Sequence, residues 1–198
     1  MNERLERAAL RKAEESARAK LDFFATEAPQ IAACAERMSR AFEAGARLYA
    51  FGNGGSACDA EHLALEFMHP VIEKRPALPA SALGTSSAFL SAVGNDRDFS
   101  FVFAAQLEQL AREGDIAVGF STSGKSASVL RGLTAARERK LLVVGFSGRD
   151  GGRMNALCDY CFTVQSFSIH RIQEVHETLI HVLWDLLHVA RGAEDVLG

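Results

Sequence analysis

The 198-residue sequence has only four cysteines, four prolines and one tryptophan, and it has no excess of basic side chains. The cysteines are too few and too scattered for a disulfide framework. With 22 Lys and Arg against 25 Asp and Glu, the formal net charge is −3, which argues against a dedicated binder of nucleic acid or anionic membranes. We therefore expect no membrane partner and no direct nucleic-acid partner.

Long apolar runs are missing as well. The longest clean apolar stretch, residues 141–146, is far shorter than the ~20 residues that a membrane-spanning helix needs. The N-terminal stretch alternates acidic and basic residues and lacks the apolar core of a secretory signal. These absences lead us to expect a cytoplasmic protein.

Two of the cysteines, Cys158 and Cys161, form a C-x-x-C motif. The surrounding segment CDYCFTV has the composition of a strand, and residues three apart on a strand face opposite sides. No second C-x-x-C is present to complete a four-thiolate zinc site. We interpret both as buried structural cysteines.

Short β-rich runs alternate with helical segments along most of the chain. Two N-terminal helices, 4–24 and 28–44, are predicted on either side of a break at Pro29. Strands are predicted at 47–51, 76–83, 115–120, 141–146 and 159–164, and helices near 56–68, 86–94, 99–112, 126–138, 151–157 and 171–191. This alternation predicts an α/β fold, a three-layer sandwich with a five-stranded parallel sheet plus the N-terminal helices, in one domain over 1–198. Ligands of such sheets bind beyond the carboxyl ends of the strands, here just after Phe51, Leu83, Phe120 and Phe146.

A glycine-rich loop, GNGGS, follows the first strand. Its glycines allow close approach of the backbone to a ligand, and Ser56 is predicted to cap a helix whose N-terminal amides face an anion. The spacing Gly52-x-Gly54-x-x-Ala57 also fits a dinucleotide fingerprint. That match is weak, because Glu73 lies in a polar, proline-flanked stretch and not at the end of a second strand.

A second loop, STSGKS, follows the third predicted strand. Gly119, Gly124, Lys125 and Ser126 satisfy the Walker A spacing of nucleotide-binding proteins. Nucleotide hydrolysis is nevertheless disfavoured, because the next strand ends in Phe-Ser-Gly without a magnesium-binding aspartate. The hydroxyls and amides of Ser121, Thr122, Ser123 and Ser126 can instead surround one phosphate; the alternative is a serine-rich helix N-terminus with no ligand.

Candidate acid–base residues lie on two predicted helices. His62 and Glu66 are four residues apart and share a helix face, and Gln173, Glu177 and His181 drift gradually around the final helix. A histidine and a glutamate at this spacing can act as general acid and base or hold a metal, and the spacing does not choose between these roles. We interpret His69 and His188 as packing residues, with His176 intermediate.

Five collinear motifs carry a specific resemblance. GNGGSACDAEHLALEF, GND (94–96), STSGKS, GRDGGRM (148–154) and RIQEVHETLIH resemble the sugar isomerase (SIS) family, and within it the phosphoheptose isomerases, which convert sedoheptulose 7-phosphate into D-glycero-D-manno-heptose 7-phosphate. The resemblance implies a flavodoxin-like SIS fold and a cis-enediol reaction. It also implies a homotetramer, to whose packing residues 1–44 contribute.

The same resemblance implies roles for individual residues. Glu66 corresponds to the general base and His181 to the general acid, and one zinc ion per subunit is held by His62, Glu66, Gln173 and His181. The expected contacts with a sugar phosphate are Asn53, Gly54, Gly55, Ser56, Glu66, Asn95, Asp96, Ser121, Thr122, Ser123, Ser126 and Gln173. No nucleotide is expected.

Two positions depart from the commonest family pattern. His170 occupies a site where many members carry an acid, after a loop that is one residue short, and Ala57 replaces a histidine of some relatives. The histidine pattern also resembles a non-catalytic branch that binds the bacterial replication initiator protein as a tetramer. That branch lacks the glutamate at the position of Glu66, so its retention here, with His62 and His181, favours an enzyme. A phosphosugar-binding or initiator-binding protein remains the alternative.

Overall fold

The protein folds around one parallel sheet, as the alternation of strands and helices predicted. The computed structural model describes residues 2–71 and 75–195. Its strands are β1 Leu48–Phe51, β2 Ala80–Ala82, β3 Ile116–Ser121, β4 Leu142–Gly148 and β5 Tyr160–Val164. Every pairing is parallel, in the order β2-β1-β3-β4-β5. The α/β class and the five-stranded parallel sheet are confirmed.

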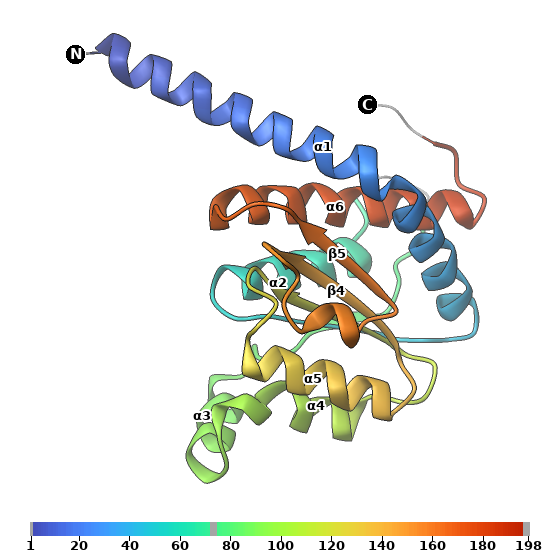
Figure 1. Ribbon diagram of the computed structural model, residues 1–198. Helices are drawn as coiled ribbons and strands as arrows, with labels where there is room; N and C mark the ends of the chain where they lie inside the picture. Colours follow the sequence, from blue (N-terminus) through green and yellow to red (C-terminus); the bar gives the residue numbers. More distant parts are fainter. Residues whose placement is uncertain (1, 72–74, 196–198) are drawn as a thin grey trace.

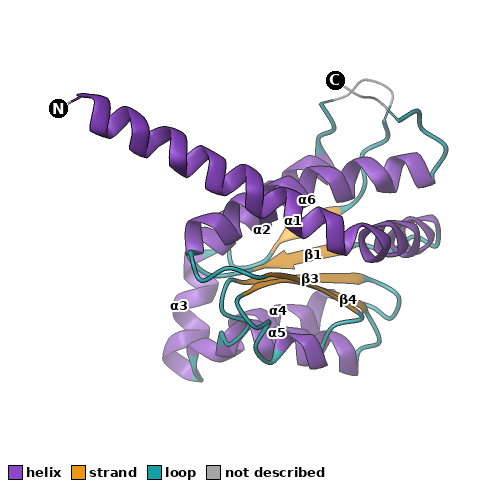
Figure 2. Cartoon of the chain, turned by 45° about the horizontal axis from the view of Figure 1, so that its top comes forward, coloured by secondary structure: helices purple, strands orange, loops and turns teal. Residues whose placement is uncertain are grey.

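Helices cover both faces of the sheet (Figures 1 and 2). One face carries α1 Asn2–Glu43, α2 Gly55–Met68 and α6 Ile169–Ala190, and the other carries α3 Ser87–Asp96, α4 Val102–Leu110 and α5 Ala127–Glu138. Two short 3₁₀ turns, Phe99–Phe101 and Met154–Ala156, complete the described elements. The three-layer arrangement is therefore confirmed.

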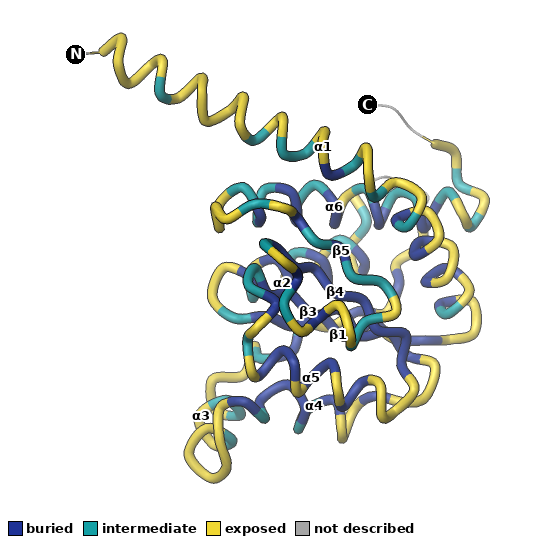
Figure 3. The backbone as a smooth tube through the Cα atoms, in the orientation of Figure 1, coloured by how far each residue is buried: buried dark blue, intermediate teal, exposed yellow. Residues whose placement is uncertain are grey.

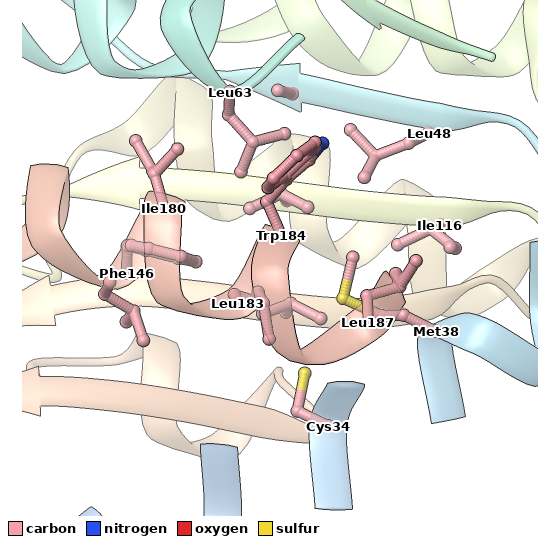
Figure 4. Packing of buried hydrophobic residues seen from close by; sticks show 14 of the residues in the cluster. Cys34, Met38, Leu48, Leu63, Ile116, Phe146, Ile180, Leu183, Trp184 and Leu187 are labelled. Carbon is pink, nitrogen blue, oxygen red and sulfur yellow. The ribbon is translucent and has the colours of Figure 1, made fainter. Parts of the chain in front are cut away.

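Helix α6 is the centre of the larger of the two hydrophobic cores. Its apolar stripe faces the sheet, and neighbours from the other helices surround it: Ile180, Leu183, Trp184 and Leu187 lie beside Leu63 of α2 and Met38 of α1 (Figure 4). Full burial of each such side chain contributes roughly 1.5–3 kcal/mol. This packing fixes α6 against α2, and that contact brings together the charged residues on the two helices.

The N-terminal segment is one helix, and the predicted break at Pro29 is wrong. Helix α1 continues through Pro29 to Glu43. Figure 1 shows it changing direction along its course, as expected because proline removes an N–H group and its ring clashes with the carbonyl four residues earlier. Burial of Ile31, Met38 and Phe42 beyond the proline holds the second part against the core, whereas most of the first twenty residues are exposed (Figure 3).

Several predicted boundaries are also corrected. The predicted helix at 151–157 is only the 3₁₀ turn Met154–Ala156, since Gly151 and Gly152 take positive φ angles of 76° and 52°. The strand predicted at 76–83 shrinks to Ala80–Ala82, because the prolines before it cannot donate to a sheet ladder. The helix predicted at 99–112 is divided into a 3₁₀ turn and α4, while α6 begins two residues earlier than predicted.

The expectation that the Cys158 and Cys161 thiols point apart is wrong. Cys158 precedes β5 in a turn, where the alternation of a strand does not apply. A methyl group on Gly145 of β4 would lie 2.6 Å from the Cys158 sulfur and 3.3 Å from the Cys161 sulfur, so both thiols meet at this glycine. Their mutual hydrogen bond raises the pKa of Cys158 and lowers the pKa of Cys161. Both are half-buried, and neither forms a disulfide.

No helix among the described residues is both long and apolar enough to cross a bilayer.

Candidate active site

The two loops singled out in the sequence leave neighbouring strands at the same edge of the sheet. Strands β1 and β3 run parallel with Phe51 opposite Gly119, so the segments that follow them are adjacent. From β1 the chain crosses to β2 on one side, and from β3 it crosses to β4 on the other. Such a reversal of strand order is the usual ligand-binding position in open α/β sheets.

Asn53 connects the two loops directly. Its side-chain Nδ2 donates hydrogen bonds to the Ser126 and Ser128 hydroxyl oxygens, both at 2.9 Å. Asn53 and Ser126 were both expected at the site, whereas Ser128 was not identified from the sequence. Its position two residues after Ser126, in the first turn of α5, was the available signal. These hydrogen bonds fix the position of the glycine-rich loop, residues 52–56 (the first loop), relative to the STSGKS loop, residues 121–126 (the serine loop).

The backbone of residues 151–153 packs against the serine loop. Gly124 has a φ of +61° and lies against Gly151 and Gly152, and its carbonyl accepts from the Arg153 amide at 3.0 Å. A side chain at Gly124 would strike that backbone, so the tight turn requires glycine here. The turn leads into the N-terminus of α5, whose unpaired backbone amides favour the binding of an anion.

The hydroxyls of the loop lie close to this N-terminus. Ser121 is buried at the end of β3, and the Ser123 hydroxyl accepts from the Lys125 amide at 3.2 Å. The Lys125 side chain instead pairs with Asp150 at 3.4 Å, where both are exposed. The hydrogen bond from the Gly152 amide, followed by the charge of Lys125, lowers the pKa of Asp150. The lysine of the Walker-like spacing therefore contacts a surface carboxylate.

Ser56 does not cap α2 as predicted. The helix begins at Gly55 with Gly54 as its N-cap residue, and no side chain makes a capping hydrogen bond there. Gly54 has a φ of +58°, a left-handed conformation that suits glycine. Ser56 is buried within the first turn. The prediction failed because Gly54 ends the loop two residues before the serine.

Three candidate acid–base residues converge between α2 and α6. His62 Nε2 lies 3.3 Å from Glu66 Oε1 and 3.2 Å from His181 Nε2. One ligand atom from each of the three residues lies within 4.8 Å of the other two. The i, i+4 spacing on α2 placed His62 and Glu66 together as predicted, and the packing of α6 supplies His181.

This donor set fits a zinc ion. Tetrahedral zinc with bonds of about 2.0–2.1 Å to nitrogen and oxygen keeps its ligand atoms about 3.3 Å apart. The two separations at His62 Nε2, 3.2 Å and 3.3 Å, match that spacing. Two imidazole nitrogens and a carboxylate are also the donors that zinc prefers. The residues present are therefore compatible with the metal.

Gln173 lies on α6 about two helical turns before His181, and no hydrogen bond among the described residues joins it to the cluster. Its side-chain amide lies directly against Gly55, at the start of α2, so a larger residue there would displace the end of Gln173. Gln173 thus faces the loop that was expected to contact a sugar. It lies one helical turn before Glu177.

Glu177, like Ser128, was not assigned to the site from the sequence. Its Oε2 lies 2.6 Å from His62 Nδ1, on the side of the ring opposite the nitrogen that faces Glu66 and His181. The four-residue spacing of Gln173, Glu177 and His181 along α6 was visible in the sequence. The contact between Glu177 and His62 on α2 was not, because it depends on how the two helices pack.

Asn95 and Asp96 are not joined to the cluster by any hydrogen bond within residues 2–71 and 75–195. They end α3 on the opposite face of the sheet, are exposed, and bond to each other at 2.8 Å. His170 lies exposed in the first turn of α6, and Ala57 lies in the first turn of α2. Glu73 lies outside the described residues.

The remaining histidines differ in environment. His176 is buried, with Nε2 3.0 Å from the Ser147 carbonyl and Nδ1 3.9 Å from Asp59. His188 is buried against Trp184, which confirms the packing interpretation, whereas His69 is exposed at the C-terminus of α2, where that interpretation is wrong. Burial, reinforced by the charges of Arg75 and Arg191, lowers the pKa of His188 to about 4.

Comparison with known proteins places these features in a family. The SIS domain family matches residues 13–148. A phosphoheptose isomerase of Desulfovibrio desulfuricans is 48% identical over 174 residues, covering 88% of this chain and 83% of that protein. One from Thermodesulfovibrio yellowstonii is 42% identical over 189 residues, covering 95% of this chain and 91% of that protein. The solved phosphoheptose isomerase of Neisseria gonorrhoeae superposes with a TM-score of 0.86 at 39% identity, covering 93% of this chain and 98% of that one. The chain belongs to the SIS domain family.

Proposed function

We propose that this protein is an aldose–ketose isomerase that converts sedoheptulose 7-phosphate into D-glycero-D-manno-heptose 7-phosphate. The observation that carries the proposal is the convergence of His62, Glu66 and His181 on α6 and on α2, the helix that begins at the glycine-rich loop. The relatives described above, named phosphoheptose isomerases and matched over most of their length, support the same reaction.

The serine loop is proposed to hold the phosphate. Hydroxyls and amides of Ser121, Thr122, Ser123 and Ser126 lie where β3 passes into α5, and hydrogen bonds to a charged phosphate are roughly twice as strong as neutral ones. Asn53, Gly54, Gly55, Ser56 and Gln173 form the neighbouring wall for the sugar. Asn95 and Asp96 complete the proposed contacts. Anchoring the phosphate would hold the open-chain sugar with C1 and C2 near Glu66.

The reaction moves two protons. The ketose carries its carbonyl at C2, and Glu66 is proposed to take a proton from C1, giving a cis-enediol, and to return it to C2. His181 is proposed to move the second proton, from the C1 hydroxyl to the C2 oxygen. Its Nε2 faces His62 and the proposed zinc, so the other ring nitrogen, Nδ1, is the one left to carry this proton, and the residue is exposed.

One zinc ion per subunit is proposed to bind between His62, Glu66, Gln173 and His181. The bound metal would polarise the sugar oxygens and stabilise negative charge that develops on them. Glu66 has two carboxylate oxygens, and Oε1 is the one that faces His62. The other is available for the proton at C1.

Substitution of Glu66 tests the acid–base assignment. Glu66→Gln is expected to lower kcat for conversion of sedoheptulose 7-phosphate about 10²–10⁴-fold, measured by NMR detection of the aldose. Binding of the sugar phosphate, measured by calorimetry, should persist. Glu61→Gln is the matched control, since Glu61 is exposed on the same helix. An unchanged kcat in Glu66→Gln contradicts the assignment.

A non-catalytic sugar-phosphate or replication-initiator binder is not favoured, because Glu66, His62 and His181 are all retained and brought together. Pure protein without turnover on any ketose phosphate, but with a reproducible protein partner, would reverse this judgement. Heat released on titration with magnesium-ATP would support the nucleotide-binding reading of Lys125 instead.

We also propose that residues 1–198 act as one SIS domain and assemble as a homotetramer in the cytoplasm. The first half of α1 extends beyond the rest of the chain (Figure 3) and exposes Leu5, Leu10 and Leu21. Exposed large apolar side chains on a protruding helix favour packing against another copy. Sedimentation velocity should give a mass four times that of the 21.4 kDa chain; a monomer contradicts this part of the proposal.

A further inference from the structure

His62 is held from both sides of its ring. Nε2 faces Glu66 and His181, while Nδ1 lies 2.6 Å from Glu177 Oε2. The Glu177 contact crosses from α6 to α2, so it depends on the packing between the two helices. At 2.6 Å it lies at the short end for a hydrogen bond between an imidazole nitrogen and a carboxylate.

The chemistry of the contact fixes the position of a proton. An ionised carboxylate only accepts hydrogen bonds, so the hydrogen between the two atoms is carried by Nδ1. In a neutral imidazole the other nitrogen, Nε2, then carries the lone pair. That lone pair points toward the space bounded by Glu66 Oε1 and His181 Nε2.

Glu177 has no competing ion-pair partner among the described residues. The nearest arginine or lysine along α6, Arg171, pairs with Glu174 at 2.9 Å. The Glu177 side chain is 39% exposed and the His62 side chain 29% exposed, so the contact is partly open to solvent. His62 is thus the one side chain that the Glu177 carboxylate contacts among the described residues.

We propose that Glu177 is a positioning residue that fixes the tautomer and ring orientation of His62 for zinc. The inference rests on the proposed zinc site. Carboxylates that accept from the second nitrogen of a metal-bound histidine hold the ring in place, and their loss weakens metal binding typically 10–100-fold. Glu177 contributes this through His62, without contacting the metal.

Zinc affinity of the metal-free protein, measured by competition with a chromophoric chelator, tests the inference directly. Glu177→Ala is expected to weaken zinc binding about 10–100-fold. Glu177→Gln should lose less, because its amide oxygen can still accept from Nδ1. Glu61→Gln removes the same charge beside His62 without this contact, and its affinity should equal that of the wild type. A Glu177→Ala protein that binds zinc within twofold of wild type overturns the inference.

The isomerase assay separates this inference from the proposed function. If the wild type is active and the Glu177→Ala variant binds zinc as tightly as the wild type, the positioning role is overturned and the proposed reaction is unaffected. If the wild type binds zinc, the Glu177→Ala variant binds it more weakly, and the wild type does not isomerise the sugar, the positioning role stands and the proposed reaction is overturned. A wild type that binds no zinc overturns the inference. Circular dichroism checks the fold of each variant, and Glu177→Gln decides the outcome if Glu177→Ala is unfolded.

Discussion

His62 and His181 are separated by 119 positions in the sequence, yet their Nε2 atoms lie 3.2 Å apart. The two rings meet edge to face at 75°, with centroids 4.9 Å apart. Two such nitrogens beside the Glu66 carboxylate are satisfied by one shared proton or by one cation. This relationship makes the metal requirement the first property to test.

Removal of zinc should abolish most of the activity and lower stability. We expect chelation to reduce kcat/KM at least 100-fold and added zinc to restore it. A ligand at 1,000 times its Kd stabilises the folded state by about 4 kcal/mol, so the metal-free protein should also melt at a lower temperature. Scanning calorimetry with and without zinc measures the shift. In His181→Ala the shift should shrink sharply; full activity after exhaustive chelation contradicts the zinc site.

The bridge from Asn53 to the serine loop makes a graded prediction. Asn53→Ala removes two hydrogen bonds of 2.9 Å, each contributing about 0.5–1.5 kcal/mol, and should raise KM for the sugar phosphate about tenfold. Ser128→Ala removes only one of the two and should raise KM less. Steady-state kinetics of both variants measure the gradient. Equal KM values for Asn53→Ala and wild type would show that the loops do not need this bridge.

The fold was predictable because each strand is a short β-rich run followed by helical spacing. The error at Pro29 has a tertiary cause: burial of Ile31, Met38 and Phe42 outweighs the lost hydrogen bond, so the helix bends and continues. The helix propensity of the residues around Pro29 does not include the free energy of this packing. The same limit explains Cys158, whose thiol meets Cys161 because of the turn before β5.

The site was predictable where its geometry is local and not where it depends on helix packing. His62 and Glu66 follow from a four-residue spacing on one helix. Contacts of His62 with Glu177, and of Gln173 with Gly55, join segments more than 100 residues apart. They require the position of α6 over α2, which is set by the apolar core beneath them.

The contact between Gln173 and Gly55 predicts a functional effect with little cost in stability. In Gly55→Ala the new methyl would displace the flexible end of Gln173, while alanine suits the helix that begins here. We expect weaker zinc binding and a higher KM, each by about tenfold, with a change of less than about 1 kcal/mol in the free energy of unfolding.

Gly54→Ala provides the contrast. Its φ of +58° with ψ of −127° is a sparsely populated conformation that would cost alanine about 1–3 kcal/mol, although nothing lies within 4 Å of the added methyl. Urea denaturation of the two variants should therefore separate a stability effect at position 54 from a functional effect at position 55. Wild-type zinc affinity and KM in Gly55→Ala would show that the position of Gln173 is unimportant.

His188 predicts how stability depends on pH. It is buried, its Nε2 has no hydrogen-bond partner among the described residues, and burial lowers its pKa from 6.5 to about 4. Between these values the unfolded chain binds a proton that the folded chain does not, so stability must fall as pH falls from 6.5 toward 4. Between pH 7.5 and pH 4.5 this one group accounts for about 2–3 kcal/mol of the loss in the free energy of unfolding.

His188→Gln isolates that contribution, because glutamine is similar in size and does not titrate. Urea denaturation at pH 7.5 and pH 4.5 should show a smaller loss of stability in the variant than in the wild type, with the carboxylates contributing equally to both. Arg75 and Arg191 add to the effect of burial by repelling a charged His188, so replacing Arg191 with glutamine should reduce the wild-type loss. Parallel stability curves for wild type and His188→Gln would mean that His188 is protonated as readily in the folded chain as in the unfolded one.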